Sequence, residues 1–389
     1  MTDLENILPL WRELEEAGAD YVLATVVAVE GSSYRKPGAR MLLTDDGRRA
    51  GTVSGGCLES EVARRAWWLT SDGPVVERYS TLGDDGDLPY GSGCGGVVFI
   101  LLERRNTAGP FIAALKAAFD ARTPLAVATV LEGPQKGRRS YAGLLPTVNH
   151  SDSLHSFEPT TNDDTAFDDL AELALARGAS IDRTLPIAGL QTRIWVDYRA
   201  ARPGLCIFGA GDDARPLVHL ARGLGWFVGV ADGRSNLATK ERFVRADAVS
   251  VLSIKSLPDQ AAQQLAWLPT DAVVIMTHSY EQDARILASL LSGAPQNMPT
   301  YIGVLGPQRR TRELMAESAR LLHLPADSDR LERWLAMPEI HAPMGLDLGA
   351  DTPASIALSI LAEIQQTLCK ATALPLRQVR ASTVTATQP

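Results

Sequence analysis

The sequence predicts an α/β protein of two domains, a mixed α/β domain in the N-terminal half and a doubly wound parallel sheet in the C-terminal half. The chain has 389 residues, which is too long for one ordinary hydrophobic core. β-branched runs joined by turn signals fill the first half, whereas short apolar strands alternate with helical stretches from Leu205 onward. We expect domains over 1–200 and 201–370, and a disordered tail without periodicity over 371–389.

The composition is that of a globular protein that is not a general nucleic-acid binder. Apolar residues make up 45% of the chain and charged residues 22%, and the formal net charge at pH 7 is −8. A nucleic-acid binder normally carries a basic stripe. No apolar run reaches the roughly 18 residues that a membrane-spanning helix needs, and the acidic, amphipathic start is unlike a signal peptide. We therefore expect a cytoplasmic protein with no nucleic-acid partner and no membrane span.

The N-terminal half begins with a helix and continues mainly as strands. Apolar residues from Leu4 to Leu14 recur at helical spacing, which predicts an amphipathic helix that ends at Gly18. The pattern then predicts strands over Tyr21–Val29, Arg40–Thr44 and into Val53, a helix over Glu59–Leu69, a buried strand over Val97–Leu102, a helix over Phe111–Ala121 and a strand over Leu125–Leu131.

Two stretches of this half are similar to each other. Residues 23–31 read "LATVVAVEG" and residues 126–133 read "AVATVLEG", and a strand repeated within one sheet would explain the similarity. The run His150–Asp169 is polar, acidic and rich in Ser, Thr and Asn. Its composition predicts a mobile surface insertion over 148–169.

The C-terminal half alternates strands with helices. Strands are predicted over Leu205–Phe208, Phe227–Ala231, Ala248–Leu252, Ala272–Met276 and Tyr301–Val304. This alternation is typical of a Rossmann-type, doubly wound parallel sheet with helices on both faces. Thr352 followed by Pro353 marks the start of a last helix.

A glycine-rich loop joins the first of these strands to the first helix. Gly209 and Gly211 let the backbone approach a phosphate, whose charge the N–H groups at the helix start can meet. Asp232 ends the second strand, where an acidic residue can accept hydrogen bonds from a ribose. Asp212 and Asp213 would repel a pyrophosphate unless one caps the helix and the other points away. A tight turn without a ligand therefore remains an alternative.

Two cysteines lie among glycines. Cys57 follows Gly55 and Gly56 at a predicted helix start, where N–H groups stabilise a thiolate. Cys94 lies in "GSGCGG", whose glycines allow the backbone to wrap closely around a ligand. We predict functional roles for both, with burial as the alternative, and packing roles for Cys206 and Cys369.

Two further places carry candidate residues. The loop Gly31–Arg40 contains Ser32, Ser33 and three cations, a combination that suits a phosphate or oxyanion, although an exposed hairpin loop is equally compatible. His278 ends the fourth strand of the predicted parallel sheet, at the edge where ligands of open α/β sheets collect. A purely structural histidine is the alternative there.

Several of these motifs together resemble one family. The stretches "ATVVAVEGSSYRKPGARML", "GTVSGGCLES" and "GSGCGG" resemble the N-terminal domain of the XdhC/CoxI family, and "FGAGDDARPL", "VIMTHSYEQD" and "YIGVLGPQRR" resemble its Rossmann domain. The resemblance covers about Tyr21 to Leu368. Pro307-Gln308 departs from the family pattern, which usually reads Ser-Arg and so has one more cation.

The resemblance implies a cofactor chaperone or maturation factor rather than an enzyme that turns over a free substrate. Its cargo would be a molybdopterin-type molybdenum cofactor, with the cytidine dinucleotide form left open, which it would help to sulfurate and insert into a xanthine dehydrogenase-type enzyme. The implied partners are that molybdoenzyme, a cysteine desulfurase-type sulfur donor and a second copy of the chain in a homodimer. No resident metal is expected beyond a molybdenum contact through Cys57.

The candidate residues fall into two groups. The catalytic candidates are Cys57, Cys94 and His278, and the cofactor-binding candidates are Ser32, Ser33, Arg40, Gly55, Gly56, Gly95, Gly96, Gly209, Gly211, Asp232, Arg234, Arg309 and Arg310. Two other classes of protein remain compatible with the same residues: an NAD(P)-dependent oxidoreductase, and a non-catalytic interaction protein with a Rossmann domain.

Overall fold

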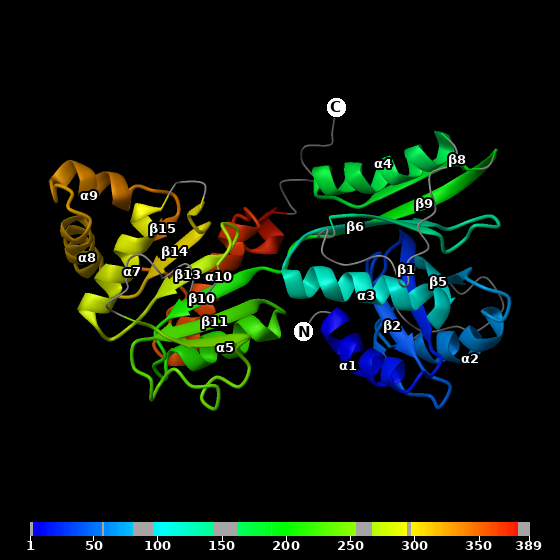
Figure 1. Ribbon diagram of the computed structural model, residues 1–389, viewed down its shortest axis with the longest axis horizontal. Helices are drawn as coiled ribbons and strands as arrows, with labels where there is room; N and C mark the ends of the chain where they lie inside the picture. The colour runs from blue at the N-terminus through cyan, green and yellow to red at the C-terminus, as the bar shows by residue number, and fades with distance from the viewer. Residues whose placement is uncertain are drawn as a thin grey trace. The chain divides into compact units, whose positions relative to one another are not determined.

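The computed structural model describes residues 3–56, 58–80, 96–143, 162–187, 189–253, 267–293 and 297–379 (Figure 1). The chain divides into two compact units, Met1–Arg202 (unit 1) and Pro203–Pro389 (unit 2). Across these described ranges, no helix is both long and apolar enough to cross a membrane.

Unit 1 contains two antiparallel sheets and four helices within its described residues. Its elements are α1 Asp3–Glu16, β1 Val22–Gly31, β2 Arg40–Leu43, β3 Arg49–Gly51, α2 Glu59–Leu69, β4 Val75–Ser80, β5 Gly96–Arg104, α3 Arg105–Ala121, β6 Leu125–Val130, β7 Arg139–Ala142, α4 Asn162–Arg177, β8 Ile181–Ile187 and β9 Leu190–Arg199. Sheet A has the order β3-β2-β1-β5-β4, and sheet B has the order β7-β6-β9-β8. The strands and helices predicted for this half are confirmed to within a few residues at their ends, except that α3 begins at Arg105 rather than at the predicted Phe111.

Each antiparallel sheet buries one face against a helix. In sheet A, alternate residues of β1 such as Ala24 and Val26 pack with Val62 of α2, as the two-residue period of a strand requires. In sheet B, Ala128 packs in the same way with Phe167 of α4. Figure 1 shows α4 lying along β6 and β9.

The other faces of the two sheets are directed toward each other. Leu23 of β1 and Val127 of β6 share one core cluster with α1 and α3. A second, smaller cluster joins Val27, Leu101 and Trp195 across the sheets. Unit 1 is therefore built around the space between sheets A and B, which α1 and α3 help to fill.

Two expectations for unit 1 are wrong. The similar stretches at 23–31 and 126–133 lie in β1 and β6, which belong to different sheets rather than to one. The predicted mobile insertion ends too late, because residues 162–169 belong to α4. Phe167 is 1% exposed and continues at helical spacing into Leu170, Ala171 and Ala174 in the same core cluster, so the acidic residues around it concealed an apolar helix face. Residues 144–161 lie outside the described residues.

Unit 2 is a doubly wound domain. Its elements are β10 Gly204–Phe208, α5 Ala214–Gly223, β11 Phe227–Asp232, β12 Ala248–Val251, β13 Ala272–Ile275, α7 Tyr280–Ser292, β14 Tyr301–Val304, α8 Gln308–Leu321, α9 Ser328–Leu335, β15 Ile340–His341 and α10 Pro353–Leu368. Sheet C has the order β12-β11-β10-β13-β14-β15, and all its pairings are parallel. This is the strand order of a Rossmann fold, and it confirms the predicted fold class.

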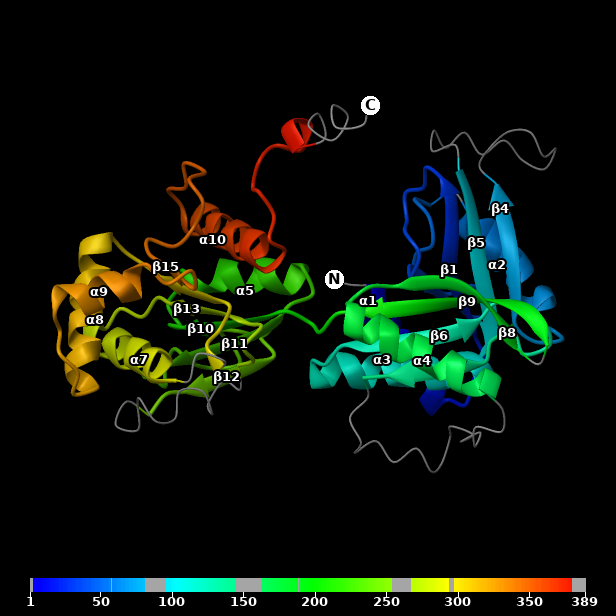
Figure 2. The ribbon, with the colours of Figure 1, turned by 90° about the horizontal axis from the view of Figure 1, so that it is seen from above.

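Helices cover both faces of sheet C. Residues of α5 and α10 pack in one core cluster, and residues of α7 and α8 pack in another. Figure 2 shows α5 and α10 on one side of sheet C and α7 on the other. Thr352 caps α10 through a capping box with Ser355, and Pro353 occupies the first turn, as the sequence predicts. After α10, residues 376–379 form a helical turn, and residues 380–389 lie outside the described residues.

Candidate functional site

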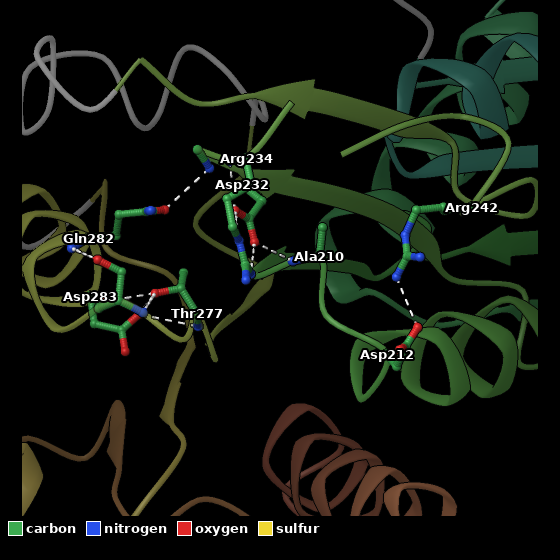
Figure 3. A network of polar contacts seen from close by, with 10 residues as sticks. Ala210, Asp212, Asp232, Arg234, Arg242, Thr277, Gln282 and Asp283 are labelled. Atoms are coloured by element: carbon green, nitrogen blue, oxygen red, sulfur yellow. Dashed lines mark hydrogen bonds and ion pairs between the residues drawn. The ribbon is translucent and has the colours of Figure 1, made fainter. Parts of the chain in front are cut away.

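The carboxyl ends of β10, β11, β13 and β14 bring several predicted residues together in unit 2. The parallel order puts these ends at one edge of sheet C, where open α/β sheets bind ligands. The glycine loop follows β10, Asp232 ends β11, and His278 follows β13. Figure 3 shows part of the polar network at this edge.

The glycine loop is packed so closely at Gly209 that a side chain is excluded there. Gly209 has a φ of +133°, and a Cβ there would lie 2.5 Å from the carbonyl oxygen of Met276. A Cβ on Gly211 would lie 3.2 Å from Nε2 of His278. The exposed His278 ring therefore lies beside the glycine loop.

Asp232 fixes this loop. Its carboxylate is fully buried and accepts a hydrogen bond from Ala210 N at 2.8 Å. It also accepts from the backbone N, Nε and Nη2 of Arg234, at 2.9, 2.9 and 2.7 Å. Burial raises the pKa of Asp232, but the hydrogen bonds from Arg234 and Ala210 lower it by more, so the pKa lies below its ordinary value.

These four bonds use the four lone-pair sites that a carboxylate offers. The predicted hydrogen bond from Asp232 to a ribose therefore requires Arg234 to move. Arg234 itself is 37% exposed, so its guanidinium can reach a ligand at the surface of the site. In this arrangement Asp232 positions the loop, and Arg234 is the group that faces solvent.

A second buried carboxylate, Asp283, was not predicted as a site residue. It accepts from Thr277 N at 3.2 Å and Thr277 Oγ1 at 2.5 Å, and from Arg310 Nη2 at 2.6 Å. Burial raises the pKa of Asp283 above its ordinary value, although these bonds oppose the shift. The carboxylate thus links the end of β13 to α8 and holds the Arg310 guanidinium at the sheet edge.

The first turn of α7 is also hydrogen-bonded to the residue that follows β11. Gln282 Oε1 accepts from Gly233 N at 3.2 Å, and Ser279 caps the helix through a bond from Gln282 N. The sequence shows the cap, since Ser279 is followed by Glu281 and Asp283. An acidic residue in a first helical turn usually stabilises the helix dipole from the surface, so the burial of Asp283 was not apparent.

Of the two aspartates at the start of α5, Asp212 is compensated by arginines. Asp212 Oδ1 lies 2.9 Å from Arg242 Nη2 and 3.8 Å from Arg215 Nη1, and Figure 3 shows it turned toward Arg242. Asp213 occupies the N-cap position of the helix, but its side chain makes no capping hydrogen bond. Arg215 and Arg242 also line a groove of about 390 Å³ beside α5, so the surroundings of the loop are more basic than the acidic composition of the chain.

The remaining predicted cation of unit 2, Arg309, is 90% exposed at its side chain and lies 3.5 Å from Glu313. Arg310 is instead held by an ion pair with the buried Asp283. Arg309 is therefore free to reorient toward a ligand, whereas Arg310 is preorganised.

In unit 1, the predicted loops leave sheet A at one end. Gly31 pairs with Gly96 between β1 and β5, and Met41 pairs with Gly51 between β2 and β3. The loop 32–39 therefore begins beside the start of β5 and ends beside the segment that follows β3. A Cβ on Gly96 would lie 2.2 Å from the carbonyl oxygen of Ser32, and one on Gly55 would lie 3.5 Å from Cγ of Tyr34. Cys57, Cys94 and Gly95 lie outside the described residues.

The segment before α2 is folded around the Ser54 hydroxyl. Ser54 Oγ accepts from Gly56 N and from Leu58 N, each at 3.1 Å. It donates to Glu59 Oε2 at 2.5 Å, and Ser54 N donates to Glu59 Oε1 at 2.9 Å. Burial raises the pKa of Glu59, but the bonds from Ser54 and Thr52 lower it by more. The residues before and after Cys57 in the chain are thereby fixed, and α2 starts at Glu59 as predicted.

Arg40 does not have the exposed position expected of a phosphate ligand. Its side chain is 6% exposed and forms an ion pair with the buried Asp197, and its Nη1 donates to Gly38 O at 3.1 Å. This buried pairing assigns Arg40 to supporting the loop rather than to contacting a ligand. Ser32 is exposed and Ser33 half-buried, so both hydroxyls remain at the surface of that loop.

A larger hollow lies at the opposite end of sheet A. It has a volume of about 920 Å³ and borders the end of α1 and the start of α3. Its two arginines are already bound, Arg104 to Asp20 at 2.7 Å and Arg105 to Glu15 at 2.8 Å. Since none of the predicted residues that the structure describes lies there, we do not assign the candidate site to it. Within the described part of the chain, no group of three His, Cys, Asp or Glu side chains is arranged to hold a metal ion.

The fold and this site define a protein with a Rossmann domain that follows a domain of two antiparallel sheets. The model of the XdhC Rossmann domain matches residues 205–364, and that of the XdhC and CoxI family matches residues 14–80. A probable xanthine dehydrogenase subunit from Bacillus subtilis (strain 168) is 31% identical over 378 residues, which cover 92% of this chain and 95% of that protein. The chain belongs to the XdhC and CoxI family.

Two other similarities agree with this family. The molybdenum cofactor insertion chaperone PaoD from Escherichia coli (strain K12) is 32% identical over 122 residues, 29% of this chain and 35% of that protein. The crystal structure of a xanthine dehydrogenase from Bacillus halodurans has a TM-score of 0.66 at 28% identity, covering 96% of this chain and 97% of that one.

Proposed function

We propose that this protein carries a molybdopterin-type molybdenum cofactor and delivers it to a xanthine dehydrogenase-type molybdenum hydroxylase. The observation that carries the proposal is the glycine loop of unit 2, in which a Cβ at Gly209 would clash with Met276 O and one at Gly211 would press against the end of the His278 side chain. A loop of this kind before a helix N-terminus suits a phosphate or pyrophosphate group. The family membership and the name of the PaoD chaperone support a pterin cargo over other phosphorylated ligands.

The side chains around the loop have distinct roles in this proposal. Backbone N–H groups of the loop from Gly211 to Asp213 bind the phosphate, because those of Ala214 and Arg215 already donate to Gly211 O and Asp212 O. Arg309 supplies mobile positive charge at the surface, and Arg234 supplies charge that Asp232 holds in place. Arg310 is held by Asp283 at 2.6 Å, so its charge costs little reorganisation when a ligand binds. His278 lies beside the phosphate-binding backbone and orients the cargo.

Sulfuration of the cargo is the second part of the proposal. A cysteine at a helix start has a stabilised thiolate, and thiolate is a soft ligand that suits molybdenum or a transferable sulfur atom. We assign this role to Cys57, which precedes α2 in the sequence, with Cys94 as the second candidate. The sulfur would come from a cysteine desulfurase-type donor, and the active form would be a homodimer.

Client activation tests this proposal. Apo enzyme of the xanthine dehydrogenase type is incubated with desulfo cofactor, a sulfur donor and either wild-type protein, Cys57→Ala or Cys206→Ala. Cys206 is fully buried in β10, so its replacement is expected to lower stability by roughly 1 kcal/mol through a small void but to keep client activation. Cys57→Ala should retain its melting temperature and lose activation.

Two outcomes would contradict parts of the proposal. Full activation by Cys57→Ala would remove the thiolate assignment and leave a non-covalent chaperone, in which backbone N–H groups and arginines alone hold the cargo. No binding of cofactor by the wild-type protein would contradict the carrier function itself.

An NAD(P)-dependent oxidoreductase is the second candidate, because the strand order and the loop of unit 2 are those of dinucleotide-binding domains. The occupied lone pairs of Asp232 argue against it, since the usual ribose contact is not available without movement of Arg234. Titration with NADH and NADPH, followed by nicotinamide fluorescence, separates the two. Binding in the low micromolar range would favour the oxidoreductase.

A further inference from the structure

Unit 1 contains the same arrangement of strands twice. The first set, β1, β2, α2, β4 and β5, gives sheet A the strand order β2-β1-β5-β4, to which β3 is added beside β2. The second set, β6, β7, α4, β8 and β9, gives sheet B the order β7-β6-β9-β8. Each set is a hairpin, a helix and a second hairpin, with the first and last strands paired antiparallel at the centre. We call residues 22–104 repeat 1 and residues 125–199 repeat 2.

The registers of the two repeats agree residue by residue. Thr25 pairs with Arg40 in repeat 1, and Thr129 pairs with Arg139 in repeat 2. Across the central strands, Leu23 pairs with Glu103, and Val127 pairs with Asp197. The "ATV" motifs at 24–26 and 128–130 thus occupy the same position in both sheets, as do the arginines and the carboxylates.

The turn before each arginine also has the same geometry. Gly38 and Gly137 both have a positive φ, of 92° and 85°. Gly38 N donates to Val26 O at 2.7 Å, and Gly137 N donates to Val130 O at 2.9 Å. Agreement in topology, register and turn conformation indicates that the two halves are structural repeats.

The repeats are joined by a reciprocal exchange of ion pairs. Arg40 of repeat 1 pairs with Asp197 of repeat 2, and Arg139 of repeat 2 pairs with Glu103 of repeat 1. All four side chains are at most 6% exposed. Both guanidinium groups lie over the ring of Phe111 in α3, at 4.8 and 4.3 Å from its centroid. Each arginine is therefore neutralised by a carboxylate of the other repeat.

The two ion pairs differ in one respect. Glu103 pairs with Arg139, whereas Asp197 pairs with Arg40 and also accepts a hydrogen bond from Arg199 Nε at 2.9 Å. Arg199 Nη2 donates in turn to Gly38 O at 2.5 Å. Burial and the charge of Arg199 lower the pKa of Arg40 to about 10, although Asp197 opposes this shift. The last strand of repeat 2 thus holds the loop 32–39 of repeat 1 at Gly38.

That loop is the one that meets the glycine-rich segments. Its Ser32 carbonyl lies against Gly96, and its Tyr34 ring lies over Gly55. The matching turn of repeat 2 carries none of the candidate ligand residues. The candidate residues of unit 1 therefore belong to repeat 1 alone, although repeat 2 supplies the groups that hold them.

We propose that Asp197 and Arg199 are positioning residues, through which repeat 2 fixes the conformation of the 32–39 loop, and that the Ser32 and Ser33 hydroxyls of this loop contact the cargo. The claim that this loop contacts the cargo rests on the proposed function, whereas the claim that repeat 2 positions the loop does not. Repeat 1 contains the 32–39 loop, and repeat 2 supplies the side chains that hold this loop in place.

The symmetry of the unit provides the matched control. Asp197→Asn and Glu103→Gln each remove one buried carboxylate charge from equivalent positions, so a general loss of stability affects both. We expect Asp197→Asn to raise amide hydrogen exchange at least tenfold in 31–39 but not in 131–138, and Glu103→Gln to do the reverse. Affinity for molybdopterin cofactor should fall about tenfold in Asp197→Asn and change less than twofold in Glu103→Gln.

A milder variant covers the case in which Asp197→Asn does not fold. Arg199→Gln leaves the Arg40–Asp197 pair in place and should still raise exchange in 31–39 and weaken cofactor binding several-fold. Arg193→Gln is its control, since Arg193 lies on the same strand and pairs with the exposed Asp182 at 2.6 Å. Unchanged exchange in 31–39 for Arg199→Gln would overturn the inference. If wild-type protein binds no cofactor, the proposed function fails while the exchange data still decide the positioning.

Discussion

Replacing Gly209 by Ala tests whether the glycine loop has the conformation on which the site depends. The residue combines a φ of +133° with a Cβ position only 2.5 Å from Met276 O. That carbonyl cannot move easily, because Met276 N is bound to Phe208 O at 2.8 Å at the centre of sheet C. Two separate penalties therefore apply to the same methyl group.

The two penalties can be added roughly. A residue with a Cβ in a sparsely populated region of φ costs about 1–3 kcal/mol, and forcing a methyl group into packed backbone costs about 1–3 kcal/mol more. A total near 3 kcal/mol corresponds to a fall in melting temperature of about 6–12 °C for a domain of this size. Gly211→Ala is the matched control, since its Cβ meets only the end of the His278 side chain at 3.2 Å, and we expect it to cost less than about 1 kcal/mol.

Both variants are measured by thermal unfolding, with hydrogen exchange of the β10 amides to report on unit 2 separately, because a chain of two units need not unfold in one step. Gly209→Ala should lower protection of β10, and Gly211→Ala should leave it unchanged while weakening binding of pyrophosphate. Equal melting temperatures for wild type and Gly209→Ala would refute the loop geometry.

Two further predictions concern the buried carboxylates. Burial raises the folded-state pKa of Asp283, so the contribution of this group to stability is fully present below the unfolded pKa of about 3.9 and is lost as pH rises through the folded pKa. In urea unfolding, the stability of wild type relative to Asp283→Asn should therefore decrease from pH 4.5 to pH 7. An increase over this range would contradict the effect of burial on the pKa. Because the folded pKa of Glu59 is lowered, Glu59→Gln should lower the free energy of unfolding by about 1–2 kcal/mol at pH 7, and by less as pH falls below about 4. Hydrogen exchange of the Gly56 and Leu58 amides should become faster in the variant. Amides that stay protected would show that Ser54 alone holds the segment.

The sequence predicts unit 2 well because its signals are local. Short apolar strands, turn residues and a capped last helix each occupy a few neighbouring residues, and the parallel order then brings the ends of β10 and β13 together. The contact of His278 with Gly211 follows from that topology. Asp283 escaped prediction because its burial depends on Thr277 and Arg310, whose contacts form only in the folded domain.

Unit 1 was predicted less completely because its decisive contacts are distant in sequence. Arg40 was expected to bind a ligand. Its ion pair with Asp197 could not be anticipated from local sequence, because Asp197 lies 157 residues away. The similarity between the two "ATV" strands was visible, but their assignment to separate sheets depends on which strands pair with them. Phe167 gave a helical signal that the surrounding acidic residues outweighed.

The identity of the ligand that copurifies with the protein tests the central claim most directly. Protein made in a host that synthesises molybdenum cofactor is purified and denatured, and the released ligand is oxidised and identified by mass spectrometry and pterin fluorescence, with Gly211→Ala protein as the control. The account predicts a phosphorylated molybdopterin derivative bound to wild type and reduced in Gly211→Ala. A stoichiometric nicotinamide dinucleotide without any pterin would contradict it.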